Sequence, residues 1–165
     1  MSKSVVITGA GTGIGRAIFD RLLADGWYVV GLDMNKDLAA SAAEAAGARG
    51  SFVVGDVADR ASLEAAADRA QAVAPLMGWV NNAGLALGGT LHDPKPDEVA
   101  RLFSVNLMGV FWGSSVAVQR FLKQRSGGAI VNTSSIHSTA AFPGWAAYDT
   151  AKGGIDALTR YTAVE

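Results

Sequence analysis

The feature that most constrains the fold is the regular alternation of short apolar runs with longer stretches of helical periodicity. The run at 4–8 is typical of a buried strand, and glycines behind it lead into 13–26, where Ile14, Ile18 and Leu22 recur at helical spacing. Over the whole chain the pattern predicts strands at 4–8, 28–33, 50–56, 77–84 and 128–135, and helices at 13–26, 36–47, 60–74, 96–124 and 145–165. Such alternation predicts a parallel sheet with helices on both faces and right-handed crossovers.

We therefore predict a doubly wound α/β fold, of the Rossmann type, in a single domain spanning 1–165, with the strand order 3-2-1-4-5. In this order the sheet changes direction between its first and fourth strands. Ligands of open α/β sheets bind at the carboxyl ends of the strands at such a point. The candidate site is expected there.

Composition narrows the classes of partner. Half of the 165 residues are apolar and the formal net charge is −1, which gives no electrostatic reason to expect nucleic acid or an anionic membrane as partner. The chain has no cysteine, so a disulfide framework and a thiolate metal site are excluded. Its two histidines, His92 and His137, are not at ligand spacing, so no metal is expected. This usage is compatible with a reducing cytoplasm, where we expect the protein to work.

One uncharged stretch, 102–119, has the length and apolar character of a membrane span. It contains five polar residues, namely Ser104, Asn106, Ser114, Ser115 and Gln119. We interpret it as a buried helix of a globular domain, with no membrane as partner. The apolar run near the N-terminus is too short for a signal peptide.

A glycine-rich turn, TGAGTGIG at 8–15, joins the first predicted strand to the first predicted helix. Glycines there would let the backbone approach a diphosphate, and the helix N-terminus offers free N–H groups. The spacing departs from the strict fingerprint G-x-G-x-x-G, and no Gly-Lys-Ser/Thr follows to make a P-loop. A plain strand–helix turn is the alternative. The candidate cofactor-binding residues of this turn are Gly9, Gly11, Thr12, Gly13, Ile14 and Gly15.

Two acidic residues end predicted strands. Asp33 lies about 20 residues after the glycines, where a carboxylate can accept hydrogen bonds from an adenosine ribose and would repel a 2′-phosphate. Asp56, followed by Val57, could meet an adenine edge. Either aspartate could instead cap a helix. The stretch NNAG ends the fourth predicted strand, and its candidate cofactor-binding residues are Asn82, Ala83 and Gly84, although a simple turn is the alternative.

A tyrosine and a lysine, Tyr148 and Lys152, share one face of the last predicted helix because they are four residues apart. A nearby ammonium favours the phenolate over the phenol, so this pair could act as an acid and base. Taken alone, the spacing favours an ordinary surface pair, because such spacings are common by chance. Asn106, near the apolar stripe of the long helix, either ties down local backbone or organises a site.

Two serines, Ser134 and Ser135, end the fifth predicted strand and could donate to a substrate oxygen, although such serines are often only caps. His137 follows two residues later and could line a substrate pocket. Trp145 and Pro143 could form walls of that pocket, with core packing as the alternative.

Taken together, TGAGTGIG, NNAG, Asn106, the serine pair and YDTAK resemble the short-chain dehydrogenase/reductase superfamily, over the whole chain. The resemblance implies a nicotinamide cofactor and reversible oxidation of a secondary alcohol to a carbonyl. It implies that Tyr148 is the acid/base, that Lys152 supports it and binds the nicotinamide ribose, that Ser135 holds the substrate oxygen and that Asn106 holds a water. From Asp33 we expect NAD, with NADP less favoured. Because the uncharged strand at 128–133 would lie at an open edge of the sheet, we also expect a homo-oligomer, a dimer or tetramer.

The sequence departs from the family in two places. No glycine follows shortly after the paired serines, and the chain ends at Glu165, inside the predicted helix at 145–165. Family members continue with two more strands and a substrate-covering segment, so we expect these to be missing here. We expect such a chain to be a fragment, or to self-associate through the strand at 128–133 and turn over little substrate. The competing hypothesis is a nucleotide-binding or interaction module that is inactive alone.

Overall fold

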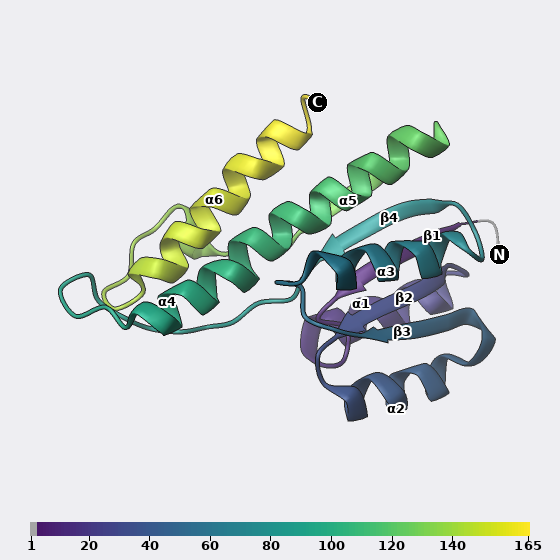
Figure 1. Ribbon diagram of the computed structural model, residues 1–165, viewed down its shortest axis with the longest axis horizontal. Helices are drawn as coiled ribbons and strands as arrows, with labels where there is room; N and C mark the ends of the chain where they lie inside the picture. The colour runs from purple at the N-terminus through teal and green to yellow at the C-terminus, as the bar shows by residue number, and fades with distance from the viewer. Residues whose placement is uncertain (1–2) are drawn as a thin grey trace.

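The computed structural model describes residues 3–165 and has the α/β architecture that the sequence predicts (Figure 1). Five parallel strands form one sheet in the order β3-β2-β1-β4-β5, which confirms the predicted order. The strands are β1 (Ser4–Thr8), β2 (Tyr28–Asp33), β3 (Gly50–Val54), β4 (Leu76–Asn81) and β5 (Ala129–Asn132). The α-helices are α1 (Gly13–Ala24), α2 (Lys36–Ala46), α3 (Arg60–Gln71), α4 (Pro96–Phe103), α5 (Gly109–Gln124) and α6 (Ala146–Thr162).

Two core layers sandwich the sheet. Val5 and Ile7 of β1 belong to the apolar cluster that contains Phe19 of α1, and Val6 between them belongs to the cluster that contains Leu63 of α3. This follows from the two-residue period of a strand, which sends successive side chains to opposite faces. Because both faces are covered, β1 is buried along its whole length, as its central β-branched run at 5–7 predicts.

Several elements end earlier than the sequence predicts. β3 ends at Val54, β4 at Asn81 and β5 at Asn132, each two or three residues before the predicted end. The residues beyond these ends leave the ladder and make other polar contacts. The backbone N–H of Asn82, for example, donates to Thr8 Oγ1 at 3.0 Å. The polar ends of the predicted strands therefore belong to the loops that surround the candidate site.

The predicted helix at 96–124 is formed, but with an irregularity at its centre. α4 and α5 are joined by a π-helical turn at Ser104–Met108, labelled η2, and the three segments make one long helix with α6 running beside it (Figure 1). By length and composition alone, Pro96–Gln124 is apolar enough to cross a membrane. Half of its most apolar window is buried within the fold, and a core helix meets the same criterion.

The long helix packs closely on β4 at Gly113. The indole of Trp79 donates to Asn81 Oδ1 at 2.7 Å, and Asn81 Nδ2 donates to Ser114 Oγ at 3.1 Å. A Cβ atom on Gly113 would lie 2.3 Å from Asn81 Oδ1 and 2.9 Å from Trp79 Nε1. The absence of a side chain at this position therefore sets how near α5 comes to the sheet.

We predict opposite effects of one substitution at two helical glycines. Gly113→Ala should lower the free energy of unfolding by about 1–3 kcal/mol through overpacking, despite the better helix propensity of alanine. Gly153→Ala in α6 should raise it by about 0.5–1 kcal/mol, because the nearest atom to its Cβ would be Ser138 O at 3.8 Å. Urea unfolding of both variants measures this. A rise in the free energy of unfolding of Gly113→Ala would contradict the packing described at Gly113.

Candidate active site

The glycine-rich turn between β1 and α1 is too tight for side chains at two of its positions. Gly9 has φ +66°, and a Cβ there would lie 2.8 Å from the Cα of Ala83. A Cβ on Gly15 would lie 2.1 Å from the carbonyl oxygen of Gly9. The turn is thus packed directly on the loop after β4, which places two of the predicted motifs side by side.

Asn82 braces these two segments with hydrogen bonds. Its Nδ2 donates to the carbonyl oxygens of Thr8 at 3.2 Å and Gly9 at 3.3 Å. In return, Thr8 Oγ1 accepts from the backbone N–H groups of Asn82 at 3.0 Å and Ala83 at 3.1 Å. The asparagine side chain therefore supports the turn, and the backbone of the NNAG loop is what faces the space above the sheet.

The N-terminus of α1 is open. Thr12 precedes the helix and makes no capping hydrogen bond with its side chain. A Cβ on Gly13, where φ is +58°, would meet no atom within 4 Å, and Ile14 is 67% exposed. Within 3–165, the backbone N–H groups of Gly13, Ile14 and Gly15 have no hydrogen-bond partner. Free N–H groups at the positive end of a helix dipole suit an anion such as a diphosphate.

A cleft of about 300 Å³ runs along the carboxyl ends of β1, β2 and β4. Eight of the predicted cofactor-binding residues line it, namely Gly9, Thr12, Asp33, Asp56, Val57, Asn82, Ala83 and Gly84. The other four residues of the turn, Gly11, Gly13, Ile14 and Gly15, do not line it. The cleft is also lined by six residues that sequence reasoning missed, namely Leu32, Met34, Gly55, Leu85, Arg101 and Val105.

Asp33 anchors the glycine-rich turn from the end of β2. Its Oδ2 accepts from the backbone N–H of Gly11 at 2.8 Å, and its Oδ1 accepts from that of Asn35 at 2.9 Å. The alternative that Asp33 caps a helix is wrong, because the side chain of Asn35 caps α2. The Asp33 carboxylate therefore lies on the wall of the cleft.

Asp56 is held in an ion pair that the sequence did not reveal. Its Oδ2 lies 2.7 Å from Arg101 Nη1, and its Oδ1 accepts from the backbone N–H of Ala58 at 2.9 Å. Burial raises the pKa of the Asp56 carboxyl, but the Ala58 hydrogen bond and Arg101 outweigh it and lower the pKa overall. Asp56 is not a helix cap, since Asp59 caps α3. Arg101 lies four residues before Val105 and therefore on the same face of the helix. This spacing is the only sequence feature that relates Arg101 to the cleft.

Asn106 sits in the π-helical turn and ties down the loop after β4. Its Oδ1 accepts from the backbone N–H of Leu85, and its Nδ2 donates to the carbonyl oxygen of Leu85, both at 2.7 Å. The side chain is buried, and both of its polar atoms are used in these bonds. Of the two expectations for Asn106, the structure shows the first, the fixing of backbone. π-Helical turns often occur at functional sites.

Tyr148 and Lys152 lie one turn apart on α6, as their spacing predicts. Lys152 is buried, and its Nζ donates to the carbonyl oxygen of Thr133 at 2.7 Å, just beyond the end of β5. The ammonium nitrogen lies 5.5 Å from the centroid of the Tyr148 ring. Burial lowers the pKa of Lys152, and the Asp156 carboxylate partly opposes this. The pair is therefore not a solvated surface pair, because the Lys152 ammonium is buried against the segment that follows β5.

The two serines differ in their contacts. Ser135 Oγ accepts from the backbone N–H of His137 at 3.2 Å and caps a short 3-10 helix at Ile136–Ser138, labelled η3. Ser134 Oγ is buried and has no hydrogen-bond partner among the described residues. Ser135 thus makes the capping contact that was one of its two sequence-based alternatives. Within 3–165, its hydroxyl group donates no hydrogen bond to a protein acceptor.

His137 is packed among aromatic rings beside Tyr148. Ring centroids lie 4.4 Å away for Phe142, 5.1 Å for Tyr148 and 5.4 Å for Trp145. His137 thus contacts Tyr148, and its predicted role in lining a substrate pocket stays a prediction, whereas His92 is exposed. A second cavity, of about 170 Å³, lies between 87–95, α4 and the start of α6, and none of the candidate residues lines it.

Comparisons with known proteins identify relatives of this chain. Residues 3–165 match the family described as short chain dehydrogenase. The chain is 35% identical to L-2,3-butanediol dehydrogenase of Corynebacterium glutamicum over 100% of this chain and 66% of that protein. It is 33% identical to the NADP-dependent (R)-specific alcohol dehydrogenase of Lentilactobacillus kefiri, over 99% of this chain and 66% of that protein. The chain thus spans about two thirds of the length of these curated relatives.

Solved structures of the same kind superpose closely. A short chain dehydrogenase/reductase from Burkholderia phymatum in complex with NAD has a TM-score of 0.91 and 34% identity, over 97% of this chain and 58% of that one. The apo form of LigO from Sphingobium sp. strain SYK-6 has a TM-score of 0.91 and 27% identity, over 99% of this chain and 62% of that one.

We predict that Asn106→Ala lowers the free energy of unfolding by about 2 kcal/mol or more, because it leaves the N–H and C=O of Leu85 without partners. Amide hydrogen exchange at Leu85 should accelerate as well. Gln119→Ala, at an exposed position on the same helix, should change the stability by less than about 0.5 kcal/mol. Unchanged protection of the Leu85 amide in Asn106→Ala would mean that Asn106 does not hold this loop.

Proposed function

The chain belongs to the short-chain dehydrogenase family, and on that premise we propose that the protein is an oxidoreductase that transfers a hydride between a nicotinamide dinucleotide and a carbonyl or secondary alcohol. The observation that carries the proposal is the placement of Lys152. Its buried ammonium is fixed to the carbonyl of Thr133, two residues before Ser135, and lies against the ring of Tyr148. This placement supports the proposal that Lys152, Tyr148 and Ser135 act together near the carboxyl end of β5.

The residues around the cleft fit a dinucleotide. The open N-terminus of α1 would hold the diphosphate on the N–H groups of Gly13, Ile14 and Gly15. Asp33 would accept hydrogen bonds from the adenosine ribose, and the wall that contains Val57 and the paired Asp56 would face the adenine. Lys152 would hold the nicotinamide ribose, with the ring of Tyr148 beside it, and Ala83 and Gly84 would let the ligand pass close to the backbone.

The bound dinucleotide would supply or accept the hydride. Tyr148 would exchange a proton with the substrate oxygen, and the Lys152 ammonium would favour the phenolate form by its positive charge. Ser135 would donate its hydroxyl proton in a hydrogen bond to the same substrate oxygen. Asn106 would act through the loop that it fixes, with its buried amide holding Leu85 and hence the loop after β4 in place.

For the cofactor, Asp33 favours NAD over NADP. Its carboxylate lies on the wall of the cleft, where a 2′-phosphate would meet a like charge. The one arginine that lines the cleft, Arg101, is engaged by Asp56. Relatives with both preferences occur, since one is described as NADP-dependent and another was solved with NAD.

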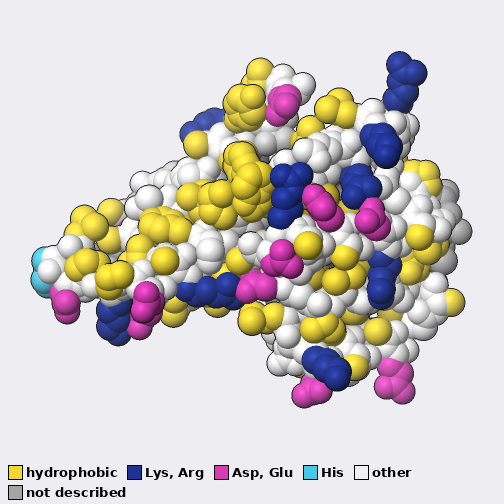
Figure 2. Space-filling view, viewed as in Figure 1, with side chains coloured by type: hydrophobic (Ala, Val, Ile, Leu, Met, Phe, Trp, Pro, Cys, Tyr) yellow, Lys and Arg dark blue, Asp and Glu magenta, His cyan; other side chains and the backbone are white. Residues whose placement is uncertain are grey.

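The wider proposals concern substrate and assembly. The substrate would be a small alcohol or ketone, in keeping with relatives described as alcohol and 2,3-butanediol dehydrogenases. A homo-oligomer is supported by exposed apolar side chains on the long helix, namely Met108 of η2 and Phe111 and Leu122 of α5, and Figure 2 shows hydrophobic side chains gathered over the region of α5 and α6. We also propose that the protein works in the cytoplasm. Residues 1–165 would form a single dinucleotide-binding domain.

We predict that Tyr148→Phe lowers kcat with secondary alcohols by at least about 100-fold, because the proton donor is lost, while the Kd for the dinucleotide stays within about twofold. Tyr161→Phe, at a 65% exposed position of the same helix, serves as the control and should leave kcat unchanged. Steady-state kinetics and fluorescence titration provide the two quantities. Retention of most of kcat in Tyr148→Phe would exclude the acid/base role. Dinucleotide binding without turnover of any alcohol by the unaltered protein would favour a nucleotide-binding module instead.

We predict that the unaltered protein binds NADH at least about 10-fold more tightly than NADPH, and that Asp33→Ala narrows this ratio by removing the charge that repels the 2′-phosphate. Asp37→Ala removes an exposed carboxylate at the start of α2 that does not line the cleft, so it should leave the ratio unchanged. Titration of each variant with both dinucleotides gives the ratios. Tighter binding of NADPH by the unaltered protein would refute the assignment.

A further inference from the structure

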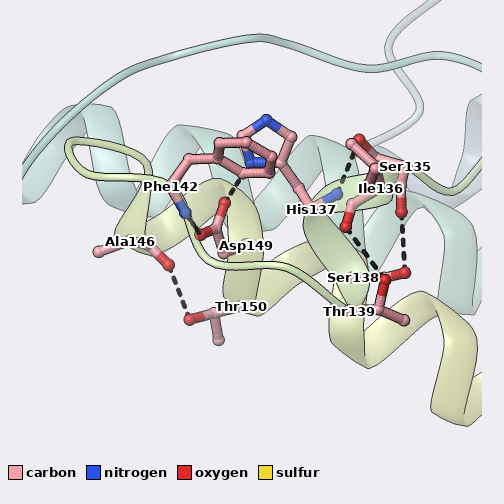
Figure 3. A network of polar contacts seen from close by, with 9 residues as sticks. All are labelled: Ser135, Ile136, His137, Ser138, Thr139, Phe142, Ala146, Asp149 and Thr150. Carbon is pink, nitrogen blue, oxygen red and sulfur yellow. Dashed lines mark hydrogen bonds and ion pairs between the residues drawn. The ribbon is translucent and has the colours of Figure 1, made fainter.

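Asp149, the residue after Tyr148, holds the segment between Ser135 and the start of α6. Its Oδ1 contacts the Nδ1 of His137, and its Oδ2 accepts from the backbone N–H of Phe142 at 3.1 Å (Figure 3). Both partners come from outside α6. One carboxylate thus fastens this segment at two points, next to the residue proposed as acid and base.

His137 is held from both sides. Its backbone N–H donates to Ser135 Oγ at 3.2 Å, while its ring contacts Asp149. The carbonyl of Ser135 also accepts from Ser138 Oγ at 2.8 Å, which fixes the short helix η3 on Ser135. Figure 3 shows these contacts as a chain from Ser135 through His137 to Asp149. Two intervening residues, His137 and Asp149, therefore connect Ser135 with Tyr148, although thirteen positions separate Ser135 and Tyr148 in the sequence.

The ring of His137 also limits where the Tyr148 ring can lie. The two rings meet edge to face with an interplanar angle of 89°, and Trp145 packs on Tyr148 at 70° with centroids 5.6 Å apart. The phenyl ring of Phe142 covers His137 in turn. A shift of the histidine ring would consequently change the position of the Tyr148 ring.

We propose that Asp149 is a positioning residue that, through His137, sets the placement of Ser135 and Tyr148 about one substrate oxygen. This inference rests on the proposed function. The contact with His137 lowers the pKa of the Asp149 carboxyl, outweighing its partial desolvation, and the Phe142 hydrogen bond adds to the effect. The carboxylate is thus charged at neutral pH and accepts both bonds. A small misplacement of reacting groups is enough to cost one to two orders of magnitude in rate.

The first test compares Asp149→Ala and His137→Phe with the unaltered protein. Each should lower kcat by about 10- to 100-fold and leave the Kd for NADH within about twofold. Because both changes break one link, the double variant should be no slower than the worse single variant. Thr150→Ala is the matched control, since it removes a hydrogen bond to Ala146 on the same turn without touching the loop, and it should keep full kcat.

Asp149→Asn keeps the proposal testable in case Asp149→Ala fails to fold. It keeps the size of the side chain and one acceptor, so it should fold normally and give a smaller loss of kcat than Asp149→Ala. Equal kcat in folded Asp149→Asn, Asp149→Ala and unaltered protein would overturn the proposal. So would additive losses in the double variant, or a loss confined to dinucleotide binding.

A second measurement is independent of turnover. The chain has only two histidines, so NMR of the imidazole groups resolves His137, with the exposed His92 as internal reference. An Nδ1–H signal of His137 protected from solvent exchange should be present in the unaltered protein and lost in Asp149→Ala. If no alcohol is turned over but this signal is seen, the proposed function fails while the contact stands. If turnover is seen and the signal is absent from the unaltered protein, the inference fails while the function stands.

Discussion

The contact between the ends of β1 and β4 is the constraint on which the rest of the candidate site depends. Thr8 and Asn82 are 74 positions apart in the chain, yet four hydrogen bonds join Thr8 and Gly9 to Asn82 and Ala83. They fix the glycine-rich turn on the neighbouring loop and so determine where the open end of α1 points. The same loop continues to Leu85, which Asn106 holds from the long helix. Cleft and helix are thereby built as one unit.

The fold was predictable because the signal for it is local and repeated. Buried parallel strands need apolar side chains on both faces, and SVVIT at β1 satisfies this without reference to the rest of the chain. The alternation of such runs with helical periodicity limits the topology to few possibilities, and the observed order 3-2-1-4-5 is the predicted one. The glycines of the turn after β1 were equally predictable, because a turn packed as closely as Gly9 on Ala83 tolerates no other residue.

What the sequence did not reveal depends on residues that meet only in three dimensions. Arg101 reaches Asp56 across 45 positions, and no local pattern pairs them. The π-helical turn at Ser104–Met108 lies in a stretch whose apolar periodicity predicts uninterrupted helix, so its position follows from the packing of Asn106 on Leu85. The place of His137 after Ser135 indicates a residue near the substrate, but nothing in YDTAK marks Asp149 as its partner, because a carboxylate on a helix is usually solvated.

The charges around the cleft explain why one aspartate can serve both structure and recognition. A carboxylate accepts at about four lone-pair positions, and Asp33 uses one on each oxygen for Gly11 and Asn35. Capacity therefore remains for a ribose hydroxyl while the turn stays anchored. Asp56 differs, since Arg101 balances its charge and Ala58 occupies its second oxygen. Of the two aspartates that line the cleft, Asp33 thus has no salt-bridge partner within 3–165, so the discrimination against a 2′-phosphate that we propose would rest on it.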